Sequence, residues 1–101
     1  MAQRNRTLQE TTTTIAPSEV LEEAKRFFPR QLGIYAAFPE QESTTHVTFR
    51  GQGGEEIVIG AYRKDDGTRV SGSTYLFDPQ VARFLATLPP LPIEAVETGG
   101  R

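Results

Sequence analysis

The stretch HVTFRGQGGEEIVIGAYRKDDGTRVSGSTYLF, residues 46–77, decides the predicted fold. Apolar and polar residues alternate along it, as they do in strands that bury one face and expose the other. Two turn sequences interrupt the alternation: GQGG at Gly51–Gly54, and KDDG at Lys64–Gly67, which is typical of a β-hairpin. The stretch therefore predicts consecutive antiparallel strands over residues 44–50, 55–63 and 68–77.

The chain before this stretch predicts a strand, a helix and a short strand. Thr7–Ile15 is rich in threonine, so we expect a strand at or near a sheet edge; a flexible leader is the alternative. Pro17 suits the first turn of a helix, and Pro29 ends it. Between them the apolar residues keep the spacing of one helical stripe: Val20, Leu21, Ala24, Phe27 and Phe28. Gly33–Phe38 (GIYAAF) is then a short strand, and the PEQES sequence turns the chain round.

A second helix follows the last predicted strand. Asp78 can cap it, and Pro79 suits its first position. Pro89 and Pro90 stop the helix, whose apolar stripe is formed by Val81, Phe84, Leu85 and Leu88. We therefore expect a flexible leader over residues 1–6, one domain over 7–88, and a tail over 89–101 that is flexible or a short docking segment.

The order of elements, β-α-β-β-β-β-α, predicts an α+β fold of two layers. A twisted antiparallel sheet of four to five strands carries both helices on one face. The sheet face under the helices is expected to contain Ile34, Ala36, Phe38, Val47, Phe49, Ile57, Ile59, Ala61, Val70 and Leu76.

Side chains alternate across a strand, so the inner face fixes the outer one. The predicted outer face consists of Tyr35, Ala37, His46, Thr48, Arg50, Val58, Gly60, Tyr62, Arg69, Ser71, Ser73 and Tyr75. Small side chains lie in its middle, charges are few, and all three tyrosines belong to it. A sheet face that only met water would normally show Lys, Glu, Gln and Thr in clean alternation. We interpret it as a contact surface, most simply of a homodimer formed sheet to sheet. The alternative interpretation is that scattered exposed tyrosines need no partner.

The composition excludes several classes of function. The 101 residues contain no cysteine, which excludes disulfides, thiolate nucleophiles and zinc–thiolate sites. The formal charge of -2 gives no general attraction to nucleic acid or to anionic lipid. No apolar run approaches the roughly 18 residues that cross a bilayer, and the first ten residues lack a secretory apolar segment. We therefore expect a cytoplasmic protein without a membrane partner.

No motif predicts catalysis, a metal or a cofactor. His46 is the only histidine and has no serine or cysteine partner in a recognisable arrangement. A strand rather than a helix follows the GQGG sequence, so it offers no phosphate site. Asp65 and Asp66 lack the further oxygen ligands that calcium requires. The sequence therefore predicts no catalytic, cofactor-binding or metal-binding residue, and a protein that is not an enzyme.

Two alternatives to self-association remain, besides a place in a larger protein assembly. A small apolar ligand could lie between the sheet and the helices. A single-stranded nucleic acid could stack on the three tyrosines of the outer face, but its phosphates would have only four basic groups in an acidic protein: Arg50, Arg63, Lys64 and Arg69.

The run TTTTIAPSEVLEEAKRFF resembles the opening of the helix-grip superfamily, the START and polyketide-cyclase-like (SRPBCC) domains, which begin with a strand, a short Ala/Pro/Ser link and such a helix. The strand GTRVSGSTYLF and the closing helix VARFLATL are also similar, so the resemblance covers Thr7–Leu88. It implies a reduced member of that superfamily that binds a small apolar ligand. The family has more strands, and a long closing helix covers its ligand cavity, whereas Pro89 stops the helix here. The resemblance assigns no functional residue.

Overall fold

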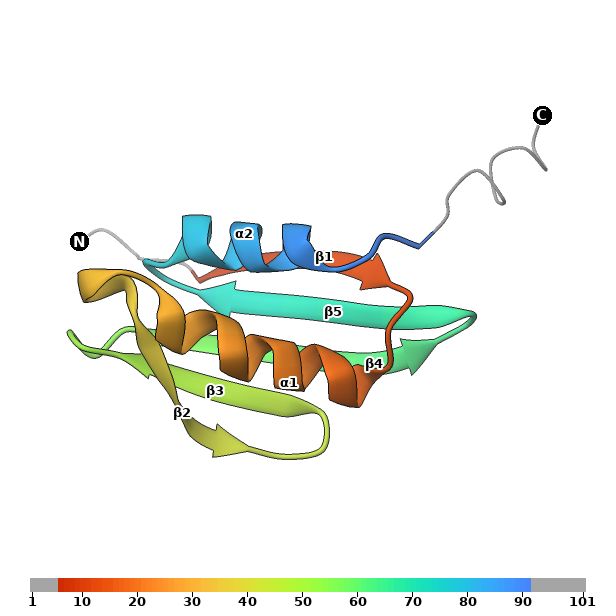
Figure 1. Cartoon of the computed structure of the whole chain (residues 1–101), viewed down its shortest axis with the longest axis horizontal. Coiled ribbons are helices and arrows are strands. Elements are labelled where there is room, and N and C mark those ends of the chain that lie inside the picture. Colours follow the sequence, from red (N-terminus) through yellow and green to blue (C-terminus); the bar gives the residue numbers. More distant parts are fainter. Residues whose placement is uncertain (1–5, 92–101) are drawn as a thin grey trace.

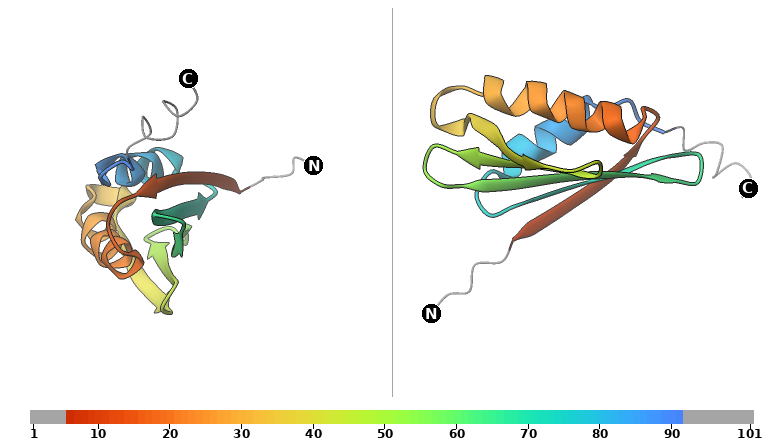
Figure 2. Two further views of the ribbon diagram at one scale, coloured as in Figure 1. Left: turned by 90° about the vertical axis from the view of Figure 1, so that its right-hand side faces the viewer. Right: turned by 90° about the horizontal axis from the view of Figure 1, so that it is seen from below.

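The computed structural model describes residues 6–91, in which a five-stranded antiparallel sheet carries two helices on one face (Figure 1 and Figure 2). The strand order is β1-β5-β4-β3-β2, so the first strand pairs with the last. The strands are β1 (Thr7–Thr13), β2 (Ala37–Glu42), β3 (His46–Gly51), β4 (Glu56–Lys64) and β5 (Gly67–Thr74). The helices are α1 (Pro17–Phe27) and α2 (Asp78–Thr87), with 3-10 turns η1 (Phe28–Arg30) and η2 (Gly33–Tyr35). The predicted α+β class is confirmed.

The predicted hairpin joins β4 to β5. Lys64 and Gly67 are its last paired residues, and Asp65 between them has φ = 55°. Aspartate tolerates this left-handed conformation better than most residues. The hairpin also sets the register that aligns the inner residues of β4 and β5 under the helices.

The core lies between the sheet and the helices, where α1 contacts β3, β4 and β5 and α2 contacts β5 and β1. The Phe28 ring is at its centre, 5.0 Å from the ring of Phe49 on the sheet and 5.4 Å from that of Phe84 on α2. These rings fill the space between the two layers. The residues predicted for the inner face that are buried are Ala36, Val47, Phe49, Ile57, Ile59, Ala61 and Val70.

Three threonines are buried in the same layer, which the sequence did not indicate. Thr13 and Thr68 donate hydrogen bonds to the carbonyl oxygens of Pro89 and Ile15, each at 2.6 Å. Thr74 donates to the carbonyl oxygen of Glu56 at 2.9 Å. Each buried hydroxyl therefore has the partner that its burial requires.

The prediction of a strand over Gly33–Phe38 is wrong. Gly33 has φ = 53° and begins the 3-10 turn η2, so β2 starts only at Ala37 and runs through the residues expected to form a turn. Ile34 is consequently 68% exposed, and Ala37 and Phe38 have exchanged the faces that the sequence predicted for them. Ala37 is fully buried, whereas Phe38 pairs with Arg50 and lies on the outer face, 49% exposed.

The end of β5 also differs from the prediction. β5 stops at Thr74, whose hydroxyl accepts a hydrogen bond from the Phe77 amide at 3.3 Å. This bond turns the chain, so Phe77 enters the core and Leu76 is 54% exposed rather than buried. Asp78 is the first residue of α2 and not its cap; Phe77 takes the cap position without a side-chain hydrogen bond.

Both described ends are attached to the sheet. Arg6, expected in the leader, hydrogen-bonds to Ser73 and Glu56, and Pro90 forms a bridge with Thr13. The remainder of the predicted leader, residues 1–5, and of the predicted tail, residues 92–101, lies outside the described residues. Within residues 6–91, no helix has the length and apolar character to span a membrane.

Candidate interaction surface

The outer sheet face is built from rows of side chains that the strand register aligns. One row runs from Leu8 through Ser73, Val58 and Thr48 to Gln41, across all five strands. The next row runs from Glu10 through Ser71 and Gly60 to His46. The interface candidates that lie on this face within strands are His46, Thr48, Arg50, Val58, Tyr62, Arg69, Ser71 and Ser73.

Six charged side chains of this face are paired with one another, whereas Lys64, at the end of β4, forms no ion pair within residues 6–91. Arg69 lies 2.6 Å from Glu10, and Arg6 lies 2.9 Å from Glu56. Arg50 lies 2.7 Å from Glu40 and 3.8 Å from Glu56. The hydrogen bond to Glu40 raises the pKa of the Arg50 guanidinium above its ordinary value. Three arginines and three glutamates therefore cancel within one chain, towards the margins of the face.

In the middle of the face, the side chains of His46 and Ser71 occupy the space above Gly60. A Cβ atom there would lie 3.0 Å from Ser71 Oγ and 3.1 Å from His46 Nε2, so both side chains lean over the glycine. His46 Nδ1 is 2.7 Å from Thr45 Oγ1, which orients the ring.

The sequence missed this cluster because its members come from three different strands. His46 faces Gly60 across the β3–β4 pair, and Gly60 faces Ser71 across the β4–β5 pair. Only the register brings them together. Among residues 6–91, no three or more His, Asp or Glu side chains form a group that could hold a metal ion.

The three tyrosines do not form the single stripe that the sequence predicts. Only Tyr62 lies within a strand of the outer face. Tyr75 follows the end of β5, with the Arg6 guanidinium 5.0 Å from the centre of its ring. Tyr35 is in η2, where its ring lies 5.8 Å from that of Phe77, because Gly33 turns the chain before β2 begins.

Exposed apolar side chains gather at one end of the fold, which we call the apolar end. It is the end where α1 finishes, β2 and β4 begin and β5 finishes, on the left of Figure 1. Tyr62 is the exception among the exposed large apolar residues of the described chain. The others are Leu8, Leu32, Ile34, Tyr35, Phe38, Tyr75 and Leu76.

The edges of the sheet are less suited to association than its face. β2 carries Pro39, which has no N–H to donate, and its register with β3 shifts between Pro39 and Gln41. At the other edge, the end of β1 is occupied by Pro89 and Pro90, through the Thr13 hydroxyl and the Thr14 amide. Prolines, irregular pairing and covered edges are the usual means by which sheets avoid pairing edge to edge.

No protein-family model matches this chain, and it has no match among the curated proteins or the solved structures. The side chains of this chain are therefore the only guide to its function.

Proposed function

We propose that this protein is a small association module that forms a homodimer through the outer sheet faces of two copies. The observation that carries the proposal is the neutral middle of the face. Thr48, Val58, Gly60, Ser71 and Ser73 are uncharged, and they adjoin one another across β3, β4 and β5. A solvated antiparallel sheet would normally place larger polar or charged side chains at several of these positions.

The distribution of charge supports a partner identical to the chain itself. In a two-fold dimer the same surface meets itself, so an excess of one charge would be opposed by the same excess on the partner. Here Arg6, Arg50 and Arg69 are each paired with a glutamate of their own chain. The middles of two such faces can approach without like-charge repulsion, and the small central residues let the backbones come close.

The same contacts argue against the alternatives. Arg50 and Arg69, two of the four basic groups proposed to hold phosphates, are already bound to carboxylates. The aromatic cluster around Phe28 occupies the space in which a ligand between sheet and helices would lie.

The topology, by contrast, supports the helix-grip resemblance: the elements follow the order β-α-β-β-β-β-α, and the two helices lie on one face of the sheet.

Light scattering coupled to size-exclusion chromatography tests the proposal. We expect a mass twice the chain mass of 11.2 kDa at high protein concentration. Val58→Arg places a charge in the middle of the face and is expected to give a monomer. Ala86→Arg, at an exposed position of α2, is the matched control and should remain dimeric. A wild-type protein that is still monomeric at about 1 mM contradicts the proposal, because the dissociation constant of the dimer would then be too high for a stable dimer.

A further inference from the structure

A groove of about 520 Å³ lies at the apolar end, on the helix side of the fold. Leu32 and Tyr35 from the segment after α1 form part of it, and Leu76 and Pro79 line it from the connection between β5 and α2. Gln31, Gln80 and Arg83 complete the lining. Its volume falls within the range of about 300–1,000 Å³ that ligand sites occupy. It is separate from the outer sheet face.

The apolar wall of the groove is fixed by contacts with the rest of the fold, but its leucine side chains are exposed to solvent. Leu32 is 85% exposed and Leu76 is 54% exposed. The Tyr35 ring packs on Phe77, and the Gly33 carbonyl accepts a hydrogen bond from Gln52 Nε2 at 2.9 Å. Exposed leucines that adjoin one another in a depression are typical of a binding surface.

The polar wall contains two groups that lack partners. Gln80 is only 5% exposed, and its Oε1 atom is buried without a hydrogen bond in the described part of the chain. Such atoms are uncommon in folded proteins. Arg83 lies one helical turn further along α2, on the same side, and forms no ion pair with any residue between 6 and 91. The groove thus offers a cation beside an apolar wall, and an acceptor without a partner is buried at its edge.

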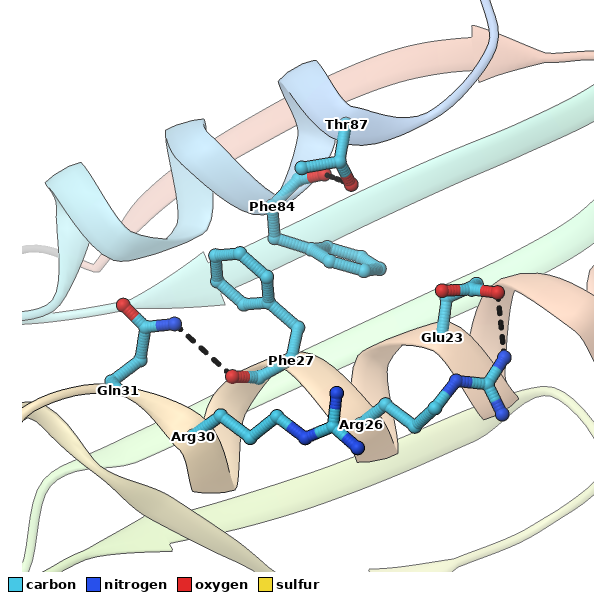
Figure 3. Close-up of a pocket in the computed structure, with 7 residues that line it drawn as sticks. All are labelled: Glu23, Arg26, Phe27, Arg30, Gln31, Phe84 and Thr87. Carbon is cyan, nitrogen blue, oxygen red and sulfur yellow. Dashed lines mark hydrogen bonds and ion pairs between the residues drawn. The ribbon is translucent and has the colours of Figure 1, made fainter.

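The surroundings leave the positive charge of Arg83 uncompensated. The nearest acidic residue along α2, Asp78, faces β1, where its Oδ2 lies 3.3 Å from Thr7 Oγ1. A neighbouring groove of about 250 Å³ between the two helices shares Gln31 (Figure 3). In it Arg26 pairs with Glu23 at 2.6 Å, and Arg30 makes no ion pair within residues 6–91, so this groove adds no net negative charge.

We propose that the groove at the apolar end binds the C-terminus of a peptide whose last residue is apolar. The terminal carboxylate pairs with the Arg83 guanidinium, because a guanidinium can form a bidentate ion pair with a carboxylate. The amide N–H of the last residue donates to Gln80 Oε1, which a rotation of that side chain presents to the groove. The apolar side chain lies against Leu32, Tyr35 and Leu76. Capture of a terminal carboxylate is an established mode of peptide recognition.

The test is a titration followed by amide NMR shifts of the full-length protein. The probes are the peptide acetyl-Gly-Ser-Gly-Ala-Leu with a free carboxylate, the same peptide with a C-terminal amide, and acetyl-leucine. We expect the free acid to bind saturably and to shift the amides of Leu32, Leu76 and Gln80. Loss of the carboxylate, or Arg83→Gln, is expected to weaken binding roughly fivefold, the effect of one exposed ion pair.

Two variants complete the test. Arg63→Gln removes an arginine at the end of β4, far from the groove, and is expected to bind like the wild type. Leu32→Asp changes a side chain that is mostly in water, so the fold is retained, and it is expected to abolish binding. Equal affinity of the acid and the amide, equal effects of Arg83→Gln and Arg63→Gln, or no saturable shift overturns the proposal. Acetyl-leucine binding as tightly as the peptide overturns the peptide as the occupant.

Discussion

The two faces of the sheet are made by the same strands but differ in their surroundings. Ile57 and Ile59 point under the helices and are fully buried, whereas Val58 between them lies half-buried on the open face. On β5, Val70 and Thr74 are buried while Ser71 and Ser73 are not. The inner face contributes the apolar contacts that stabilise the fold. The outer face contributes little to them, which leaves its side chains available to a partner.

Truncation of a buried aliphatic side chain provides the largest contrast between the faces. Ile57→Ala creates a cavity in the core and should lower the free energy of unfolding by about 2–5 kcal/mol. Val58→Ala at the next position should lower it by about 0.5 kcal/mol or less, since its side chain is on the open face. Urea unfolding at concentrations where the protein is monomeric measures both. Similar losses for the two variants would show that the outer face is part of the core.

Two central glycines allow the same substitution to be compared on opposite faces. A Cβ on Gly72 would lie 2.5 Å from Val81 Cγ1 in the core, so Gly72→Ala should cost about 1–3 kcal/mol of stability. A Cβ on Gly60 meets His46 and Ser71, which can turn into solvent, so Gly60→Ala should cost about 1 kcal/mol or less. Thermal unfolding measures the difference. If Gly60→Ala lowers the stability more than Gly72→Ala does, the side chains of His46 and Ser71 cannot turn into solvent.

Buried and open hydroxyl groups provide a smaller contrast. Thr74→Val removes the hydroxyl that donates to the Glu56 carbonyl and accepts from the Phe77 amide. It should lower the free energy of unfolding by about 1–2 kcal/mol because both groups lose a partner. Ser73→Ala removes an acceptor of Arg6 on the open face, where water can replace it, and should cost about 0.5 kcal/mol. The same urea titrations distinguish them. Equal costs would indicate that water does not reach Ser73.

The smallest effect on stability is expected for Lys25, at the edge of the helix layer. Hydrogen bonds to Glu42 and then to Glu22 raise the pKa of Lys25 above its ordinary value of 10.5. A lysine whose pKa is higher in the folded than in the unfolded state stabilises the fold. This contribution is complete at pH values below the pKa of the unfolded state, and it is lost as the pH rises through the pKa of the folded state. The melting temperature of the wild type should therefore fall towards that of Lys25→Met between about pH 10 and 12. A difference that grows with pH would contradict the pairing.

Residues 44–77 were largely predictable because their signal is local. Alternation of apolar and polar residues assigned Ile57, Ile59 and Val70 to the core, and KDDG marked the hairpin. Residues 31–42 were not predictable in this way. GIYAAF has the composition of a strand, but Gly33 adopts a left-handed conformation and η2 forms instead, which exposes Ile34 and turns Phe38 outward. A short apolar run does not reveal which of its residues begins the strand.

The candidate site divides in the same way. The sequence indicated that His46, Thr48, Val58, Tyr62, Ser71 and Ser73 share a face. It did not reveal that His46 and Ser71 meet above Gly60, or that Gln80 and Arg83 border a groove with Leu32 and Leu76. It also placed Tyr35 on the outer face, from which η2 removes it.

The sequence by itself determined which side chains share a face of β3, β4, β5 and both helices, because within an element that depends only on the period of the backbone. The tertiary structure alone decided which of those faces meet and which residues become neighbours. Arg6 and Ser73 are in contact although 67 positions separate them. Such contacts depend on strand register and on the turns that set it, and a shift of one residue replaces every neighbour across the sheet.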